Sequence, residues 1–305
     1  MKKLTVLGSV NVDHVLQLNH LPKPGETVSS ESYQVLGGGK GANQAMAAAR
    51  MGADITFIAC VGSDAIGHQL VDSFASAGIN TAGIEQIAGS NTGTAMIFVD
   101  ANGENCIGIS AQANAHLTSD CIQTKRTFIE TADALLLQLE TPVEGVIFAA
   151  QVAKDSGTKV ILNPAPASEL PDHLLAMVDL ITPNETEAER LTGIRVTDEA
   201  TAAQACDVLH GKGIAEVLIT LGARGVWYSN AGVGERYTGF SVKAVDTTAA
   251  GDCFNGALVA ALLKDNAMSD AVTFAQAAAA LSVTRSGAQD SIPELSEVVA
   301  FIEQH

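Results

Sequence analysis

An aspartate stands at the start of a long, alanine-rich apolar run, Phe254 to Leu263, which predicts a helix. The first N–H groups of a helix have no partners within it, and the helix dipole adds partial positive charge there, so such an end binds anions. We expect the amides of Ala249, Ala250 and Gly251 to hold a transferring phosphoryl group. The neighbouring Asp252 could accept a proton from an attacking hydroxyl.

A second glycine-rich cluster, Gly37 to Asn43, precedes another alanine-rich segment that predicts a helix from Gln44 to Met51, ending at Gly52. Two glycine-rich helix starts could form two halves of one site. Taken alone, Asp252 could merely cap a buried helix, which is the commoner role of aspartate at such a position. The second cluster favours a functional site.

Both clusters resemble the signatures of the ribokinase-like carbohydrate kinase family. The first signature corresponds to Gly38–Gly52 and the second to Asp246–Leu258, and Asn184–Glu187 matches the family's Asn-x-x-Glu motif. The resemblance runs from the opening Gly8–Asp13 to Gly287–Pro293, which is essentially the whole chain. It implies a ribokinase-like three-layer α/β/α fold, with a mostly parallel central sheet and a small β-sheet lid.

Strand-like and helix-like segments alternate along the chain. Such alternation predicts a mostly parallel sheet covered by helices, because parallel strands need crossover connections. The expected strands are residues 4–10, 55–61, 134–139, 159–162, 179–182 and 217–220, and the expected helices include 66–77, 143–155, 185–192 and 200–210.

Two stretches, residues 15–36 and 94–110, interrupt this alternation. The second contains Asn102-Gly103 between two alternating runs, which indicates a hairpin. We interpret both stretches as one small β subdomain, a lid on a single kinase domain spanning residues 1–305. A lid would keep water from ATP during transfer. The same strands could also form an oligomer interface, and the resemblance implies a homodimer joined through the lids.

Composition predicts a soluble enzyme without a nucleic-acid or membrane partner. The 305-residue chain is 47% apolar, enough for a large core, and its net charge of −17 would repel nucleic acids and anionic membranes at long range. No segment approaches transmembrane length. The five cysteines lack metal or redox spacing and are expected to be reduced thiols in the cytoplasm.

A sugar has several hydroxyls, so its site needs short side chains that donate and accept hydrogen bonds. Asn11 and Asp13 are expected where the first strand ends, which is where open α/β sheets bind ligands. Individually, these residues could be turn residues or solvated charges. The resemblance assigns the sugar pocket to Asn11, Asp13, Gly39, Lys40, Asn43 and Glu140, with Asp252 reaching the primary hydroxyl.

The resemblance also implies direct in-line transfer from ATP, with Asp252 as the general base and no covalent intermediate. Mg²⁺ would be held through water ordered by Glu187, because this cation keeps part of its hydration shell. The nucleotide contacts implied are Asn184, Thr220, Gly222, Gly225, Gly251 and Gln276.

Many family members are activated by a monovalent cation, and the resemblance carries that site to this chain as a K⁺ site. Most of its residues would offer backbone carbonyl oxygens, so their side chains cannot confirm it. A K⁺ ion there would fix the loop that carries the anion-binding amides. The matching residues are Asp246, Thr248, Ser282, Arg285, Gly287 and Ser291.

The motifs most resemble those of family members that phosphorylate the primary 5-hydroxyl of D-ribose to give D-ribose 5-phosphate. Deoxyribose, fructose, a nucleoside or a sugar phosphate are alternative acceptors. A sugar phosphate would need a basic cluster, and Lys40 is the single basic candidate among the 17 Lys and Arg residues. A non-catalytic nucleotide- or sugar-binding regulator is a rival from another class, although it would have no need of Asp252.

Overall fold

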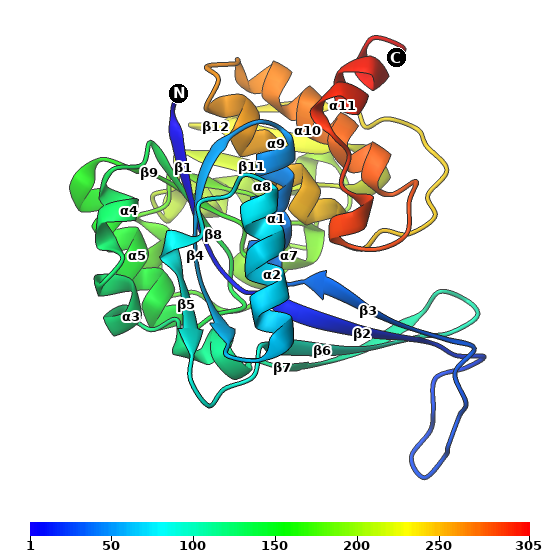
Figure 1. The fold of residues 1–305 in the computed structure, drawn as a ribbon. Coiled ribbons are helices and arrows are strands. Elements are labelled where there is room, and N and C mark those ends of the chain that lie inside the picture. The colour runs from blue at the N-terminus through cyan, green and yellow to red at the C-terminus, as the bar shows by residue number, and fades with distance from the viewer.

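The computed structural model describes residues 1–305 and is built around a nine-stranded sheet, ordered β13-β12-β11-β10-β9-β8-β1-β4-β5 (Figure 1). All neighbours run parallel except the pairs β11–β12 and β12–β13. The strands are β1 (Lys3–Leu7), β4 (Asp54–Gly62), β5 (Ile84–Ile87), β8 (Ala134–Leu137), β9 (Lys159–Leu162), β10 (Leu180–Ile181), β11 (Glu216–Thr220), β12 (Val226–Asn230) and β13 (Val233–Tyr237).

Helices cover both faces of this sheet, as expected for a three-layer fold. Side chains of the central strands alternate between two cores: Phe57 and Ala59 belong to one, and Ile58 and Cys60 to the other. The first core takes residues from α1 (Lys40–Arg50), α2 (Ala65–Ser76), α9 (Ala250–Leu262), α10 (Met268–Ser282) and α11 (Leu295–Ile302). The second takes residues from α3 (Ser119–Gln123), α4 (Arg126–Glu130), α5 (Val143–Ser156), α6 (Asp172–Leu175), α7 (Glu185–Thr192) and α8 (Glu199–Gly211).

None of these helices combines the length and the apolar character needed to cross a lipid bilayer.

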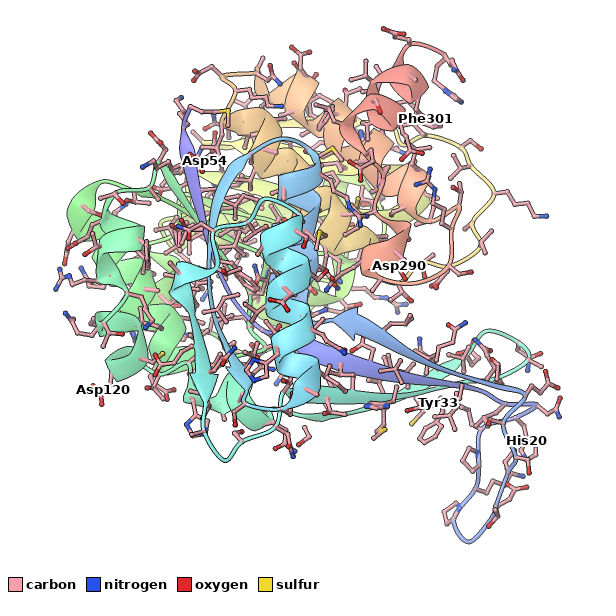
Figure 2. All side chains as sticks on the ribbon, in the orientation of Figure 1. His20, Tyr33, Asp54, Asp120, Asp290 and Phe301 are labelled. Carbon is pink, nitrogen blue, oxygen red and sulfur yellow. The ribbon has the colours of Figure 1, made fainter.

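A separate four-stranded sheet, ordered β3-β2-β6-β7, projects from the main body (Figure 1). Its strands are β2 (Asn11–Gln17), β3 (Ser32–Gly38), β6 (Gly93–Val99) and β7 (Asn105–Ser110). The predicted hairpin joins β6 to β7, with Gly103 at φ 84° in the turn. Figure 2 places Tyr33 on this sheet and His20 near its far end. The two stretches that interrupt the βα alternation therefore do form one sheet.

Three predicted boundaries were wrong in ways that matter for the site. The first strand ends at Leu7 instead of Val10, so Asn11 and Asp13 begin β2 of the small sheet instead of ending a strand of the large one. The first glycine-rich cluster is partly helical, because α1 begins at Lys40. Likewise α9 begins at Ala250, which puts Asp252 inside its first turn.

Candidate active site

The start of α9 presents free backbone amides beside a buried carboxylate. Ala249 precedes the helix in a left-handed conformation, with φ 58° and ψ 13°, which is uncommon for a residue with a side chain. The N–H of Ala250 donates to the Thr247 carbonyl at 3.2 Å, whereas those of Ala249, Gly251 and Asp252 have no backbone acceptor. Free amides therefore lie where the anion site was predicted, and the N–H of Ala250 alone among the three predicted amides donates within the protein.

The start of α1 is different, because its amides are already satisfied. Lys40 N–H donates to Glu140 Oε2 at 3.1 Å, Gly41 N–H to Ser9 Oγ at 3.4 Å and Ala42 N–H to the Ser9 carbonyl at 2.9 Å. The backbone approaches closely here: a Cβ on Gly39, at φ 90°, would lie 2.8 Å from Asn11 N. The first glycine-rich cluster thus contributes side chains to the site, not a second anion-binding helix end.

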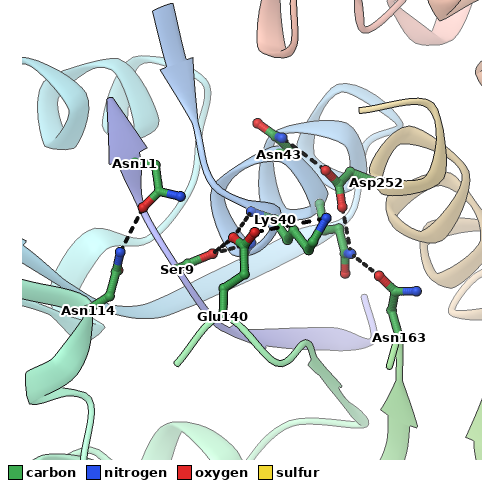
Figure 3. A network of polar contacts seen from close by, with 10 residues as sticks. Ser9, Asn11, Lys40, Asn43, Asn114, Glu140, Asn163 and Asp252 are labelled. Atoms are coloured by element: carbon green, nitrogen blue, oxygen red, sulfur yellow. Dashed lines mark hydrogen bonds and ion pairs between the residues drawn. The ribbon is translucent and has the colours of Figure 1, made fainter. Parts of the chain in front are cut away.

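Two of those side chains hold the carboxylate of Asp252 (Figure 3). Asn43 Nδ2 donates to Asp252 Oδ2 at 2.9 Å, and Gln44 Nε2 donates to Oδ1 at 2.9 Å. Residues about two hundred positions apart in the chain meet because α1 and α9 pack directly on each other: a Cβ on Gly256 would lie 2.5 Å from the Gln44 carbonyl oxygen. The packing of α1 against α9 therefore positions the candidate base.

Glu140 follows β8 and bridges the two parts of the site. Its Oε2 accepts from the Ser9 hydroxyl at 2.7 Å as well as from the Lys40 amide, and its Oε1 lies 3.9 Å from Lys40 Nζ (Figure 3). Glu140 thus holds the start of α1 next to the link between β1 and β2.

Asn11 and Asp13 reach the site from the small sheet. Asn114 fixes the first of them: its Nδ2 donates to Asn11 Oδ1 at 2.8 Å and to the Val10 carbonyl at 3.0 Å, while its Oδ1 accepts from Val10 N–H. Asp13 pairs with β3, and a Cβ on Gly38 would meet Asp13 Oδ2 at 2.1 Å, so any side chain there would displace the Asp13 carboxylate. Both predicted sugar residues therefore lie at the junction of the two sheets.

Burial and like charge dominate the electrostatics of this site. Burial, followed by the nearby Glu140 and Asp252 carboxylates, raises the pKa of Asp13 to about 6. Burial also raises the pKa of Asp252, more than Lys40 and the hydrogen bonds from α1 lower it. Burial alone would lower the pKa of Lys40, but the surrounding carboxylates, Asp252 first among them, raise it. Lys40 therefore stays a cation among acids.

Most of the predicted nucleotide residues lie where β10 and β11 end, at the carboxyl edge of the sheet. Asn184 and Thr220 form a parallel bridge, and the Thr220 N–H donates to the Pro183 carbonyl at 2.9 Å. Gly222 begins a short turn after β11, and Gly225 ends it at φ 99°. Gln276 on α10 is buried, and its Oε1 has no hydrogen-bond partner.

Asn184 and Glu187 also have a structural role, as the capping box of α7. Asn184 Oδ1 accepts from the Glu187 N–H and Glu187 Oε2 accepts from the Asn184 N–H, both at 2.8 Å. Glu187 Oε1 accepts no hydrogen bond from the protein. Burial raises the pKa of Glu187, and Lys40 and Asp252 face it. No group of three or more His, Cys, Asp or Glu side chains is gathered to hold a metal.

The predicted cation residues lie on loops that Asp246 ties together. Asp246 Oδ1 accepts from the Thr248 N–H and Oδ2 from the Gly287 N–H, both at 2.9 Å. Burial alone would raise the pKa of Asp246, but these hydrogen bonds lower it. Arg285 instead directs its side chain to Glu297 at 2.6 Å. Ser282 ends α10, and Ser291 Oγ donates to the Ala288 carbonyl at 2.8 Å.

Sequence reasoning missed several side chains that support the site. Ser9, Asn114 and Asn163 contact predicted residues from positions far away in the chain. Gln44 lies inside the first glycine-rich signature, so its position in that motif was a usable signal. Ser9 lies in the opening Gly8–Asp13, which carries part of the resemblance, whereas Asn114 and Asn163 lie in segments whose residue types alone carry no such signal.

The fold and this junction of two sheets define an α/β enzyme of the sugar kinase class. The chain belongs to the pfkB family of carbohydrate kinases, since it matches the family described as "pfkB family carbohydrate kinase" over residues 1–295.

Relatives and solved structures agree with this assignment. The curated ribokinase of Haemophilus influenzae is 52% identical over 302 residues, which cover 99% of each chain. The curated deoxyribokinase of Salmonella typhi is 35% identical over 300 residues, which cover 98% of each chain. The structure of Arabidopsis thaliana ribokinase complexed with ribose and ATP is similar with a TM-score of 0.92, at 32% identity and 99% coverage of each chain.

Proposed function

We propose that this protein transfers the γ-phosphoryl group of ATP to the primary 5-hydroxyl of D-ribose, giving D-ribose 5-phosphate and ADP. The single observation that carries the proposal is the buried Asp252 carboxylate next to the free amides of Ala249 and Gly251. A base next to an anion site is what phosphoryl transfer to a hydroxyl needs. The 52% identity to the Haemophilus influenzae ribokinase supports ribose as the acceptor.

In this mechanism Asp252 accepts the proton of the sugar hydroxyl as that oxygen attacks the γ-phosphorus in line with the leaving ADP. The amides of Ala249 and Gly251 donate to the oxygens of the migrating phosphoryl group, where charge accumulates in the transition state. The burial of Asp252 favours this chemistry, because a carboxylate with a raised pKa is a stronger base. The ammonium group of Lys40 would offset part of the charge.

The sugar would lie where the small sheet meets the large one. Asn11, Asp13, Asn43 and Glu140 together offer amide donors and carboxylate acceptors, the combination that distinguishes a polyol from an apolar ligand. The buried Oδ1 of Asn43 has no partner within the protein, so a sugar hydroxyl could donate to it. Gly39 lets the backbone approach closely at this point.

The nucleotide would lie along Asn184, Thr220, Gly222, Gly225 and Gln276, with its phosphates toward Gly251. The unpartnered Oε1 of Gln276 is a candidate acceptor for a group of the nucleotide.

Cations are part of this proposal, and the donor atoms suit them. The free Oε1 of Glu187 fits a hard cation that keeps its own water, and Mg²⁺ when bound neutralises the ATP phosphates. Asp246 and the nearby carbonyl oxygens suit K⁺, which when bound would fix the loop before α9. The K⁺ ligands would be Asp246, Thr248, Ser282, Arg285, Gly287 and Ser291.

We further propose that the small sheet acts as a lid and as the contact between two copies of the chain. Large apolar side chains stay exposed on it, and a second copy would cover them. They are Tyr33, Val35, Met96, Ile107 and Ile109.

A cytoplasmic location is part of the same proposal. All five cysteines are free thiols, including Cys60 and Cys121, whose sulfurs lie 3.7 Å apart in a hydrogen bond and form no disulfide. Unbonded thiols are typical of a reducing compartment.

The test is ADP release from MgATP with D-ribose, 2-deoxyribose, fructose, adenosine and fructose 6-phosphate, followed by identification of the phosphorylated carbon. A preference for ribose with the phosphate on its 5-oxygen would support the proposal. A preference for another acceptor would retain the mechanism and overturn the substrate, and 2-deoxyribose is the main rival because of the Salmonella typhi relative. No acceptor-dependent turnover would favour a non-catalytic regulator.

A further inference from the structure

A chain of buried amide side chains leads to Asp252. Gln44 on α1, Gln138 after β8 and Asn163 after β9 are each at most 6% exposed. Gln138 Nε2 donates to Gln44 Oε1 at 2.6 Å, and Gln44 Nε2 donates both to Asn163 Oδ1 and to Asp252 Oδ1 at 2.9 Å. Within these three amides only Gln138 Oε1 lacks a hydrogen-bond partner. Burial of polar groups is costly, so their arrangement calls for a purpose.

The hydrogen bonds allow the Gln44 amide only one orientation. Gln138 donates to its oxygen, and Asn163 presents an oxygen to its nitrogen because the Asn163 Nδ2 is committed to the Thr182 carbonyl at 3.0 Å. A flipped Gln44 amide would turn its oxygen toward Asn163 Oδ1 and toward Asp252 Oδ1, which places oxygen against oxygen at both contacts. Gln44 therefore always directs an N–H toward Asp252.

We propose that Gln44 is a positioning residue that holds Oδ1 of Asp252 and leaves Oδ2 as the atom that takes the proton from the acceptor hydroxyl. The inference rests on the proposed function. It adds the identity of the reacting carboxylate oxygen and of the side chain that orients the carboxylate. In the step itself, the acceptor O–H bond breaks, its proton passes to Oδ2, and the oxygen's electron pair forms the new bond to the γ-phosphorus. The bond from the γ-phosphorus to the bridging oxygen breaks, and ADP leaves with its electron pair.

The surroundings of Oδ2 support this assignment. Its protein partner is Asn43 Nδ2 at 2.9 Å, and the other end of that amide, Asn43 Oδ1, is buried without a partner. An unsatisfied acceptor at this point indicates a ligand donor next to Oδ2. No such vacancy exists beside Oδ1, because every polar atom of the Gln44 amide is already used.

Charged groups also face Asp252. Lys40 on α1 attracts it, whereas Glu140, Asp13 and Glu187 from three other segments repel its negative charge. Burial raises the pKa of Asp252, and the hydrogen bond from Gln44 partly offsets this by lowering it. Removal of that donor would raise the pKa, so the carboxylate would stay protonated, and inactive as a base, up to a higher pH.

The experiment measures kcat and KM as functions of pH for the full chain and for Gln44→Met, which keeps the side-chain volume and removes the donor. We expect kcat at pH 7 to fall roughly ten- to hundred-fold, less than loss of the base itself. The acid limb of the kcat profile should move up by about one pH unit. KM for sugar and ATP should stay within about twofold, because Gln44 contacts neither ligand.

Two further variants separate the effect of Gln44 on the Asp252 carboxylate from a general effect on the fold. Gln138→Met removes the donor to Gln44 Oε1 but keeps the contacts of Gln44 Nε2 with Asn163 and Asp252. Because one hydrogen bond in a chain strengthens the next, the Gln44 N–H becomes a weaker donor, and the acid limb should move in the same direction by less. Gln86→Met, at an exposed position outside this network, should match the wild-type profile. An unchanged profile in Gln44→Met, or a uniform loss of kcat without movement of the acid limb, would overturn the proposal.

A second readout keeps this test independent of the proposed acceptor. In protein labelled with ¹³C at aspartate carboxyl carbons, the Asp252 signal is assigned by its loss in Asp252→Asn, and its titration gives the pKa directly. A higher pKa in Gln44→Met than in wild type supports the role of Gln44 even if ribose is not the substrate. Equal values contradict it, whatever the acceptor.

Discussion

The contact between α1 and α9 predicts a large effect from one methyl group at Gly256. A Cβ there would lie 2.5 Å from the Gln44 carbonyl oxygen and 2.6 Å from Ala47 Cβ, and it would meet backbone that cannot rotate away. Ordinary Cβ contacts begin near 3.4 Å, so Gly256→Ala must separate the helices by up to about 0.9 Å, a strain of about 1–3 kcal/mol.

That separation would act on the site, because α1 carries both donors to Asp252. Their hydrogen bonds are 2.9 Å long in the native packing and would stretch toward about 3.8 Å, beyond the useful range. We expect kcat to fall roughly ten- to hundred-fold, as for misplacements of about 1 Å. The Tm should fall by a few degrees.

The assay is kcat from coupled ADP release, with Tm from calorimetry on the same samples. Gly211→Ala is the matched control, since Gly211 ends α8 and a Cβ there would meet nothing within 4 Å. The control should keep the wild-type kcat and Tm. Wild-type values for Gly256→Ala would refute the claim that this helix contact positions the base.

Three other predictions concern charge, cation and assembly. The pKa of Asp13 in the folded protein, about 6, lies above its ordinary value of 3.8, so ionisation of Asp13 destabilises the fold as the pH rises from about 4 through 6. Asp13→Asn should therefore raise the Tm of the unliganded protein more at pH 8 than at pH 5. Equal increases in Tm at the two pH values would contradict this. Replacing K⁺ with Na⁺ at constant ionic strength should lower kcat, and equal rates would count against the cation site. Tyr33 and Ile107 lie on opposite faces of the small sheet. In sedimentation velocity, either Tyr33→Asp or Ile107→Asp should turn a dimer into a monomer, whereas Val143→Asp on α5 should not. A monomeric wild type would contradict the proposed dimer.

Local sequence patterns predicted the elements that depend on local forces. Residues 185–192 form the predicted helix with the same bounds, because Asn184 and Glu187 cap it and Gly193 ends it. The strand at residues 159–162 was likewise predicted with its observed bounds. These signals lie within a few residues of the element they define.

The junction of the two sheets could not be predicted in the same way. The run from Leu4 to Val10 reads as one strand, but at Gly8 the chain passes within close contact of Gly41, where a Cβ on Gly41 would lie 2.5 Å from the Gly8 carbonyl carbon. Asn11 therefore enters the small sheet. That turn depends on a helix that begins more than thirty residues later, so it belongs to the tertiary structure.

The polar contacts behind Asp252 have the same origin. Gln44, Gln138 and Asn163 come together because β8 and β9 are neighbours in the sheet and α1 packs over their ends. Each residue on its own is an ordinary amide. Their common purpose becomes visible only when distance and burial are known.

The central claim is that Asp252 is the base for transfer to a sugar hydroxyl, and Asp252→Asn tests it most directly. The fold should tolerate this change, since the free Oδ1 of Asn43 could turn to accept from the new amide. With ribose and MgATP we predict that kcat falls by about two to four orders of magnitude, with KM for ATP nearly unchanged. A kcat within a few-fold of the wild type, in a folded variant, would contradict the account.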